Sequence, residues 1–120
     1  DDYTLYLFRF DRSLSDDSTM VVNEGTAPTL PWFEGIVKQP LENLKILHNQ
    51  SGQFLLLNSR LNEGDHIILG KPENPVMVNG QDRKNILSLE SDFFELVKGE
   101  NTFEITDGVD LTMYWKERWK

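Results

Sequence analysis

The sequence predicts an all-β protein whose many short strands form a sandwich or a barrel. Three observations support this fold class. Apolar residues mostly alternate with polar ones, which is the pattern of strands that bury one face. Turn-forming residues separate the apolar runs at intervals of roughly eight to twelve residues, a spacing typical of sandwiches and barrels. No segment keeps a helical period of about 3.6 residues.

The alternation is clearest near the C-terminal end of the chain. Between residues 109 and 116 every second residue is apolar, so we expect Trp115 in the core and Tyr114 on the opposite face. The runs at 54–57 and 67–69 are continuously apolar, which indicates strands covered on both faces. The other expected strands are residues 3–10, 20–22, 44–48, 76–78 and 102–105.

The turns between these runs carry residues that tolerate a positive φ. Asn79-Gly80 is typical of a tight hairpin turn. Residues 83–89 allow one or two helical turns, and they equally allow an irregular crossing or a strand. The polar run from Asp11 to Thr19 is expected to be an exposed loop. Further turns are expected at residues 49–52, 63–65, 98–101 and 107–108.

The 120 residues fit one sandwich domain, residues 1–120, because domains most often contain about 100–150 residues. Within it, residues 1–19 form an opening strand and a polar loop, and they are also a candidate linker from a missing N-terminal domain. Residues 20–119 form the core of the fold. The chain begins at Asp1-Asp2 without an initiator Met, so we expect a processed chain or, preferably, a domain of a longer protein.

Charge and composition argue against several kinds of partner. The formal net charge is −8, with 20 acidic and 12 basic residues, so nucleic acid and an anionic membrane surface are not expected to bind. No apolar run approaches the roughly 20 residues that cross a bilayer. The absence of cysteine removes disulfides and thiolate metal sites.

The sequence predicts no catalytic residue, no cofactor and no metal site. His48 and His66 lie in no recognisable catalytic motif, and we expect them to be half-buried or exposed structural residues. The stretch from Asp107 to Asp110 lacks the alternating oxygen ligands of a calcium loop and is expected to be a hairpin turn. We therefore expect a protein that is not an enzyme.

Aromatic residues supply the candidate contact site. Trp32, Tyr114 and Trp119 are candidates to touch a saccharide or a protein partner, because exposed Trp and Tyr rings stack on sugar rings. Trp119 could instead pack as a lid over the edge of the core.

Several motifs, taken in order, resemble one family. They begin with Asn23-Glu24-Gly25-Thr26-Ala27-Pro28 and continue through the segments at 46–52, 61–67 and 76–80. The most distinctive stretch is residues 91–101, and residues 114–119 look like a closing strand. In order and spacing these motifs resemble the C-terminal domain of siphophage distal tail proteins, over residues 20–119.

The resemblance implies a galectin-like, jelly-roll-like fold, which is a two-sheet antiparallel β-sandwich. It also implies a structural component of a phage or prophage tail tip or baseplate, made in the host cytoplasm and located in the virion. Such a domain would be an adaptor that links the tail to baseplate or receptor-binding proteins. The full-length protein would form a ring oligomer, whereas the isolated domain would be a monomer.

Two other functions stay open at this point. A carbohydrate-binding module that recognises host cell-wall saccharides would share the fold, and an exposed Trp or Tyr on a concave face would favour it. A hydrolase would need a cleft with at least two convergent ionisable groups. The sequence does not distinguish a free phage from a prophage or a tail-like device.

Overall fold

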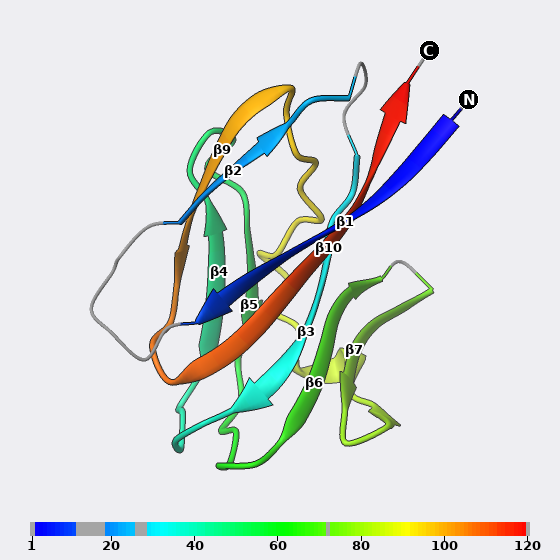
Figure 1. Ribbon diagram of the computed structural model, residues 1–120. Coiled ribbons are helices and arrows are strands. Elements are labelled where there is room, and N and C mark those ends of the chain that lie inside the picture. Colours follow the sequence, from blue (N-terminus) through cyan, green and yellow to red (C-terminus); the bar gives the residue numbers. More distant parts are fainter. Residues whose placement is uncertain (1, 12–18, 26–28, 72, 120) are drawn as a thin grey trace.

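The computed structural model describes residues 2–11, 19–25, 29–71 and 73–119, and side chains within 21–25, 29–71 and 73–116. Two antiparallel sheets pack face to face as a β-sandwich, which confirms the predicted fold class (Figure 1). The larger sheet has six strands, in the order β1 (Asp2–Asp11), β10 (Val109–Trp119), β3 (Trp32–Val37), β6 (His66–Lys71), β7 (Asn74–Val78) and β8 (Gln81–Asp82). The smaller sheet has four strands, in the order β2 (Thr19–Asn23), β9 (Gly99–Ile105), β4 (Leu44–His48) and β5 (Phe54–Leu57).

The core lies between the two sheets and follows the two-residue alternation of the strands. In β10 the odd-numbered residues from Val109 to Trp115 are buried, while Tyr114 lies on the outer face, as predicted. The apolar runs of β5 and β6 alternate in burial and are not covered equally on both faces. The largest fully buried side chains are Phe33, Phe94, Phe103, Leu44, Ile46, Leu57, Ile67, Leu69, Leu96, Leu111 and Met113.

Most of the expected strands are present, and two strands, β3 and the two-residue β8, were not expected. β3 lies between β10 and β6 in the larger sheet, although Pro28 and Pro31 made the sequence before it look broken. The segment 83–89 contains a single 3₁₀ turn, η1 (Lys84–Ile86). This is the shorter of the two helical alternatives that the sequence allowed. Residues 12–18 of the predicted polar loop lie outside the described residues.

The hairpin between β7 and β8 shows how the turn chemistry works. Asn79 has φ 52° and Gly80 has φ 80°, the positive pair that a tight hairpin turn requires. The Asn79 side chain also accepts a hydrogen bond from the His66 N–H at 2.9 Å. The other predicted turns each contain a glycine with positive φ: Gly52, Gly64, Gly99 and Gly108.

Among the described residues, no helix is long and apolar enough to span a membrane.

Candidate functional site

Two of the three predicted contact residues lie together on the outer face of the six-stranded sheet. Trp32 of β3 pairs directly with Tyr114 of β10. Their rings stack with centroids 5.5 Å apart and planes 6° from parallel. Lys71, at the end of β6, holds its ammonium 5.4 Å from the centre of the Trp32 ring. Three adjacent strands therefore contribute one aromatic platform, which we define as Trp32, Tyr114 and Lys71.

The platform combines apolar area with a fixed charge. All three side chains are partly exposed. Offset aromatic stacking and a cation over a ring each contribute on the order of 1 kcal/mol, so the rings are held in a defined orientation. Sequence reasoning identified the two rings but not Lys71, because only strand pairing brings Lys71 beside Trp32.

Polar groups and a shallow hollow lie on the same sheet. His66 Nε2 is 2.8 Å from the Glu34 carboxylate, and both side chains are about two-fifths exposed. The hollow lies between β3 and β10, where Lys38 Nζ is 3.8 Å from the Asp110 carboxylate. It is lined by Gly35, Ile36, Lys38, Asp110 and Thr112.

The third predicted contact residue is not placed beside the other two. Trp119 ends β10, and its backbone pairs with Asp2 of β1. Its side chain lies outside the described side chains. The role predicted for Trp119, as a contact or as a lid, therefore stays a prediction.

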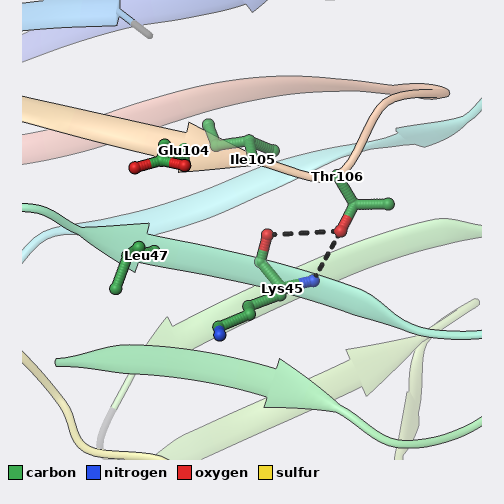
Figure 2. Close-up of a pocket in the computed structure, with 5 residues that line it drawn as sticks. All are labelled: Lys45, Leu47, Glu104, Ile105 and Thr106. Atoms are coloured by element: carbon green, nitrogen blue, oxygen red, sulfur yellow. Dashed lines mark hydrogen bonds between the residues drawn. The ribbon is translucent and has the colours of Figure 1, made fainter. Parts of the chain in front are cut away.

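A second shallow hollow lies on the four-stranded sheet and offers little chemistry. Figure 2 shows Lys45 and Leu47 of β4 opposite Glu104, Ile105 and Thr106. The Thr106 hydroxyl accepts a hydrogen bond from the Lys45 N–H at 2.9 Å and donates to the Lys45 carbonyl at 3.5 Å. The Lys45 ammonium lies 4.5 Å from the centre of the Phe54 ring. The hydroxyl therefore fixes the residue that follows β9 to the backbone of β4.

One group of side chains has the connectivity of a catalytic triad. Ser51 Oγ is 2.8 Å from His48 Nδ1, and Asn101 Oδ1 is 2.7 Å from His48 Nε2. His48 is 0% exposed, which differs from the half-buried or exposed position that the sequence suggested. Its ring stacks on Phe94 with centroids 5.1 Å apart. The ring is therefore enclosed in the core, and its two nitrogens face the neutral side chains of Ser51 and Asn101.

The same contacts explain a structural role for this group. Asn101 Nδ2 donates to the carbonyls of Val97 and Gly99, so its Oδ1 faces His48 and accepts from the Val97 N–H as well. His48 therefore carries its proton on Nε2, and its Nδ1 accepts from the Ser51 hydroxyl. This buried network fastens residues 97–101 to the β4–β5 turn. No local sequence pattern indicates it, because its members lie far apart in the chain.

Within the described residues, no group of three or more His, Asp or Glu side chains is arranged to hold a metal ion. Gly108, with φ 93°, lies in the turn between β9 and β10. These strands belong to different sheets, so the stretch from Asp107 to Asp110 is a turn that crosses between the sheets, and the expected hairpin was wrong.

Comparison with known families decides the identity of this sandwich. Residues 24–119 match the family model described as "Siphovirus-type tail component, C-terminal domain". The chain belongs to this family. The match covers most of the chain, and it confirms the resemblance seen in the sequence motifs. As a siphovirus-type tail component, the protein has a structural role in a phage tail.

A solved structure shows the same fold. The Dit protein (gp 19.1) of phage SPP1 superposes with a TM-score of 0.78 and is 19% identical in sequence. The alignment covers 95% of this chain and 46% of that protein, so this tail component spans less than half the length of its structural relative. The SPP1 protein is described as a paradigm of the hub adsorption apparatus in phages that infect Gram-positive bacteria. No curated protein matches the sequence of this chain.

Proposed function

We propose that this domain is a non-catalytic adaptor at the tail tip, which links the tail to baseplate or receptor-binding proteins. The observation that carries the proposal is the family match over residues 24–119, together with the sandwich fold of a hub protein. The longer protein would supply the ring at the end of the tail, and this domain would project from it.

The architecture suits an adaptor on physical grounds. The two sheets share a continuous core, so the domain can transmit position from one neighbour to another without deforming. Its polar network joins residues 97–101 to the β4–β5 turn, and the long antiparallel pairing of β1 with β10 joins the first strand of the sandwich to the last. His48 and Ser51 are hydrogen-bonded to each other within this scaffold, which supports a structural role for the pair.

Cross-linking in assembled particles tests the adaptor role. Exposed lysines mark different faces of the domain: Lys38 on the larger sheet, Lys45 on the smaller sheet, Lys84 in η1 and Lys98 before β9. We expect an amine-reactive cross-linker to join at least one of them to a baseplate or receptor-binding protein. Cross-links that reach only tail-tube proteins, or only other copies of this chain, would contradict the proposal.

The aromatic platform favours one second candidate, the recognition of host cell-wall saccharides. Trp32 and Tyr114 present partly exposed ring surface, and Lys71 and Glu34 add polar groups beside them. Sugar rings stack on such aromatic surface and use neighbouring polar groups for orientation. Under this alternative, the larger sheet would face the host wall.

Binding of the labelled chain to intact host cells and to purified wall polysaccharide separates the two functions. Saturable binding that free polysaccharide competes away, and that Trp32→Ala abolishes, would support the saccharide role. Val22→Ala is the matched control, because Val22 is an exposed apolar residue of β2, which belongs to the other sheet. Absence of binding at high micromolar concentration would overturn the saccharide role and leave the adaptor role standing.

A further inference from the structure

The segment between η1 and β9, residues 87–98, is a strap that runs along the sandwich from η1 to the start of β9 (drawn mostly in yellow in Figure 1). It has no regular secondary structure, yet it is fastened along its whole length. Leu87 forms a bridge with Leu57, and the Ser88 N–H donates to the Leu56 carbonyl at 2.8 Å. The Asp92 N–H donates to the Phe54 carbonyl at 2.9 Å. The first half of the strap therefore follows the edge of β5.

The second half of the strap is fixed by the core. Phe94 is 2% exposed, and its ring meets Phe33 of the larger sheet and Phe103 of the smaller sheet. Leu96 is fully buried and forms a bridge with Thr29. Val97 is held by Asn101 through two hydrogen bonds of 2.9 Å. A segment held by these contacts loses little conformational freedom when a partner binds it.

Between its anchors, the strap presents large apolar side chains to solvent. Leu89 is 103% exposed, Phe93 is 39% exposed and Val97 is 38% exposed. Leu30, which follows the bridge from Thr29 to Leu96, is 38% exposed. Most of the exposed large hydrophobic side chains of the described residues therefore lie on or beside this one segment. Clustered exposed apolar residues mark interaction surfaces, whereas a segment that only closes a sandwich needs none facing outward.

Charges on the strap restrict the partner. Glu90, Asp92 and Glu95 are exposed among the apolar side chains, and Lys98 is the one basic residue of the segment. Together with the net charge of −8, this surface would repel a second copy of the chain and an anionic wall polymer. It complements an apolar pocket rimmed by Lys and Arg, because such a rim would pair with the exposed carboxylates.

We propose that the strap patch, defined as Leu30, Leu89, Phe93 and Val97, docks into an apolar, basic-rimmed surface of a neighbouring tail-tip protein. The inference rests on the proposed adaptor function and names the face that performs it. Leu89 and Phe93 would enter the pocket, and Glu90 and Glu95 would orient the contact.

Titration of the chain against each purified tail-tip and baseplate protein of the same phage tests this docking. We expect one of them to bind, with Leu89→Ser/Phe93→Ser weakening the affinity about 10-fold or more, as the truncation of central apolar contacts does. Glu90→Lys/Glu95→Lys should weaken binding most at low salt, where charges are least screened. Ile36→Ser, which removes an exposed apolar side chain of β3 outside the strap and the platform, should leave the affinity unchanged. The variants should stay folded and unfold close to the wild-type temperature, because Leu89, Glu90 and Glu95 are exposed and Phe93 is 39% exposed.

The outcomes separate this inference from the proposed function. Binding that survives Leu89→Ser/Phe93→Ser in a folded chain would overturn the strap patch and leave the adaptor role intact. Absence of binding to every tail-tip and baseplate protein would overturn both. Self-association of the chain that the double variant abolishes would show that a second copy occupies the patch, which also overturns this inference.

Discussion

Asn101 is a wholly buried amide that uses all of its side-chain hydrogen-bonding groups. Its Oδ1 accepts from His48 and Val97, and its Nδ2 donates to two carbonyl oxygens. The substitution Asn101→Asp keeps the shape of the side chain but turns a carboxylate oxygen toward those two carbonyls. Because an unsatisfied buried polar group costs about 1–3 kcal/mol, we expect the free energy of unfolding to fall by at least about 2 kcal/mol.

Urea denaturation measures this loss. The matched control is Asn49→Asp, because Asn49 is exposed and its side chain donates to the Thr102 hydroxyl at 3.1 Å. The control should cost less than about 1 kcal/mol, as most surface substitutions do. Equal losses in the two variants would show that the buried network contributes nothing specific to stability.

Gly35 of β3 lies where a side chain has no room. A Cβ atom at this position would lie 1.9 Å from the Asp110 carbonyl oxygen and 2.9 Å from a Leu111 methyl carbon. Because the obstacle is backbone, the strands would have to separate. We expect Gly35→Ala to lower the free energy of unfolding by about 3 kcal/mol, at the upper end of the range for overpacking.

Gly52 provides the comparison that isolates this steric effect. It has φ 73°, and a Cβ atom added to it would meet nothing within 4 Å beyond its chain neighbours. Gly52→Ala should therefore cost only about 1 kcal/mol, the backbone penalty for a left-handed conformation. Thermal or urea unfolding compares the two variants. If the Gly52 variant is the less stable one, the predicted steric clash between residue 35 and the backbone of Asp110 is wrong.

At the scale of the strands, local patterns predicted most elements, and the exceptions have physical reasons. The alternation in β10 and the Asn79-Gly80 turn are local signals, and both are confirmed. β3 was missed because Pro31 precedes it and Gly35 interrupts its pattern. Gly35 is tolerated in the middle of a sheet because the neighbouring strand approaches it too closely for any side chain.

The candidate surfaces were predictable only in part, because strand pairing assembles them. Alternation placed Tyr114 on the outer face, but only the register of β3 with β10 puts Trp32 opposite it. The contact of His48 with Asn101 joins residues 53 positions apart in the chain. Residues 91–101 were the most distinctive stretch of the family resemblance, but nothing local distinguishes the buried Phe94 from the exposed Phe93.

The strap should behave as an ordered element although it has no regular secondary structure. Its Leu96 and Val97 amides donate hydrogen bonds of 2.8 and 2.9 Å beside buried anchors. We expect these amides to exchange with deuterium at least about 100-fold more slowly than that of Leu89, whose side chain is fully exposed. Hydrogen exchange followed by NMR measures this. Uniformly fast exchange across residues 87–98 would show that the strap is not preorganised.

At the scale of the whole molecule, charge and sheet edges act in opposite directions on self-association. β1 and β8 are the edge strands of the larger sheet, and β1 is ten residues long. A long edge strand can pair with a second copy through its open backbone groups. The net charge of −8 opposes this, because two copies repel each other before their edges meet.

We expect repulsion to win and the chain to sediment as a monomer over a wide concentration range. Under the proposed function, assembly into a tail would then depend on partners of opposite charge. Sedimentation velocity at low and at physiological salt tests whether charge repulsion outweighs edge pairing, because salt screens the repulsion between two copies. A dimer that strengthens as salt is raised would contradict the expectation and would indicate edge pairing. If Thr4→Pro, which removes one backbone donor from β1, then abolishes that dimer, β1 is the edge through which two copies meet.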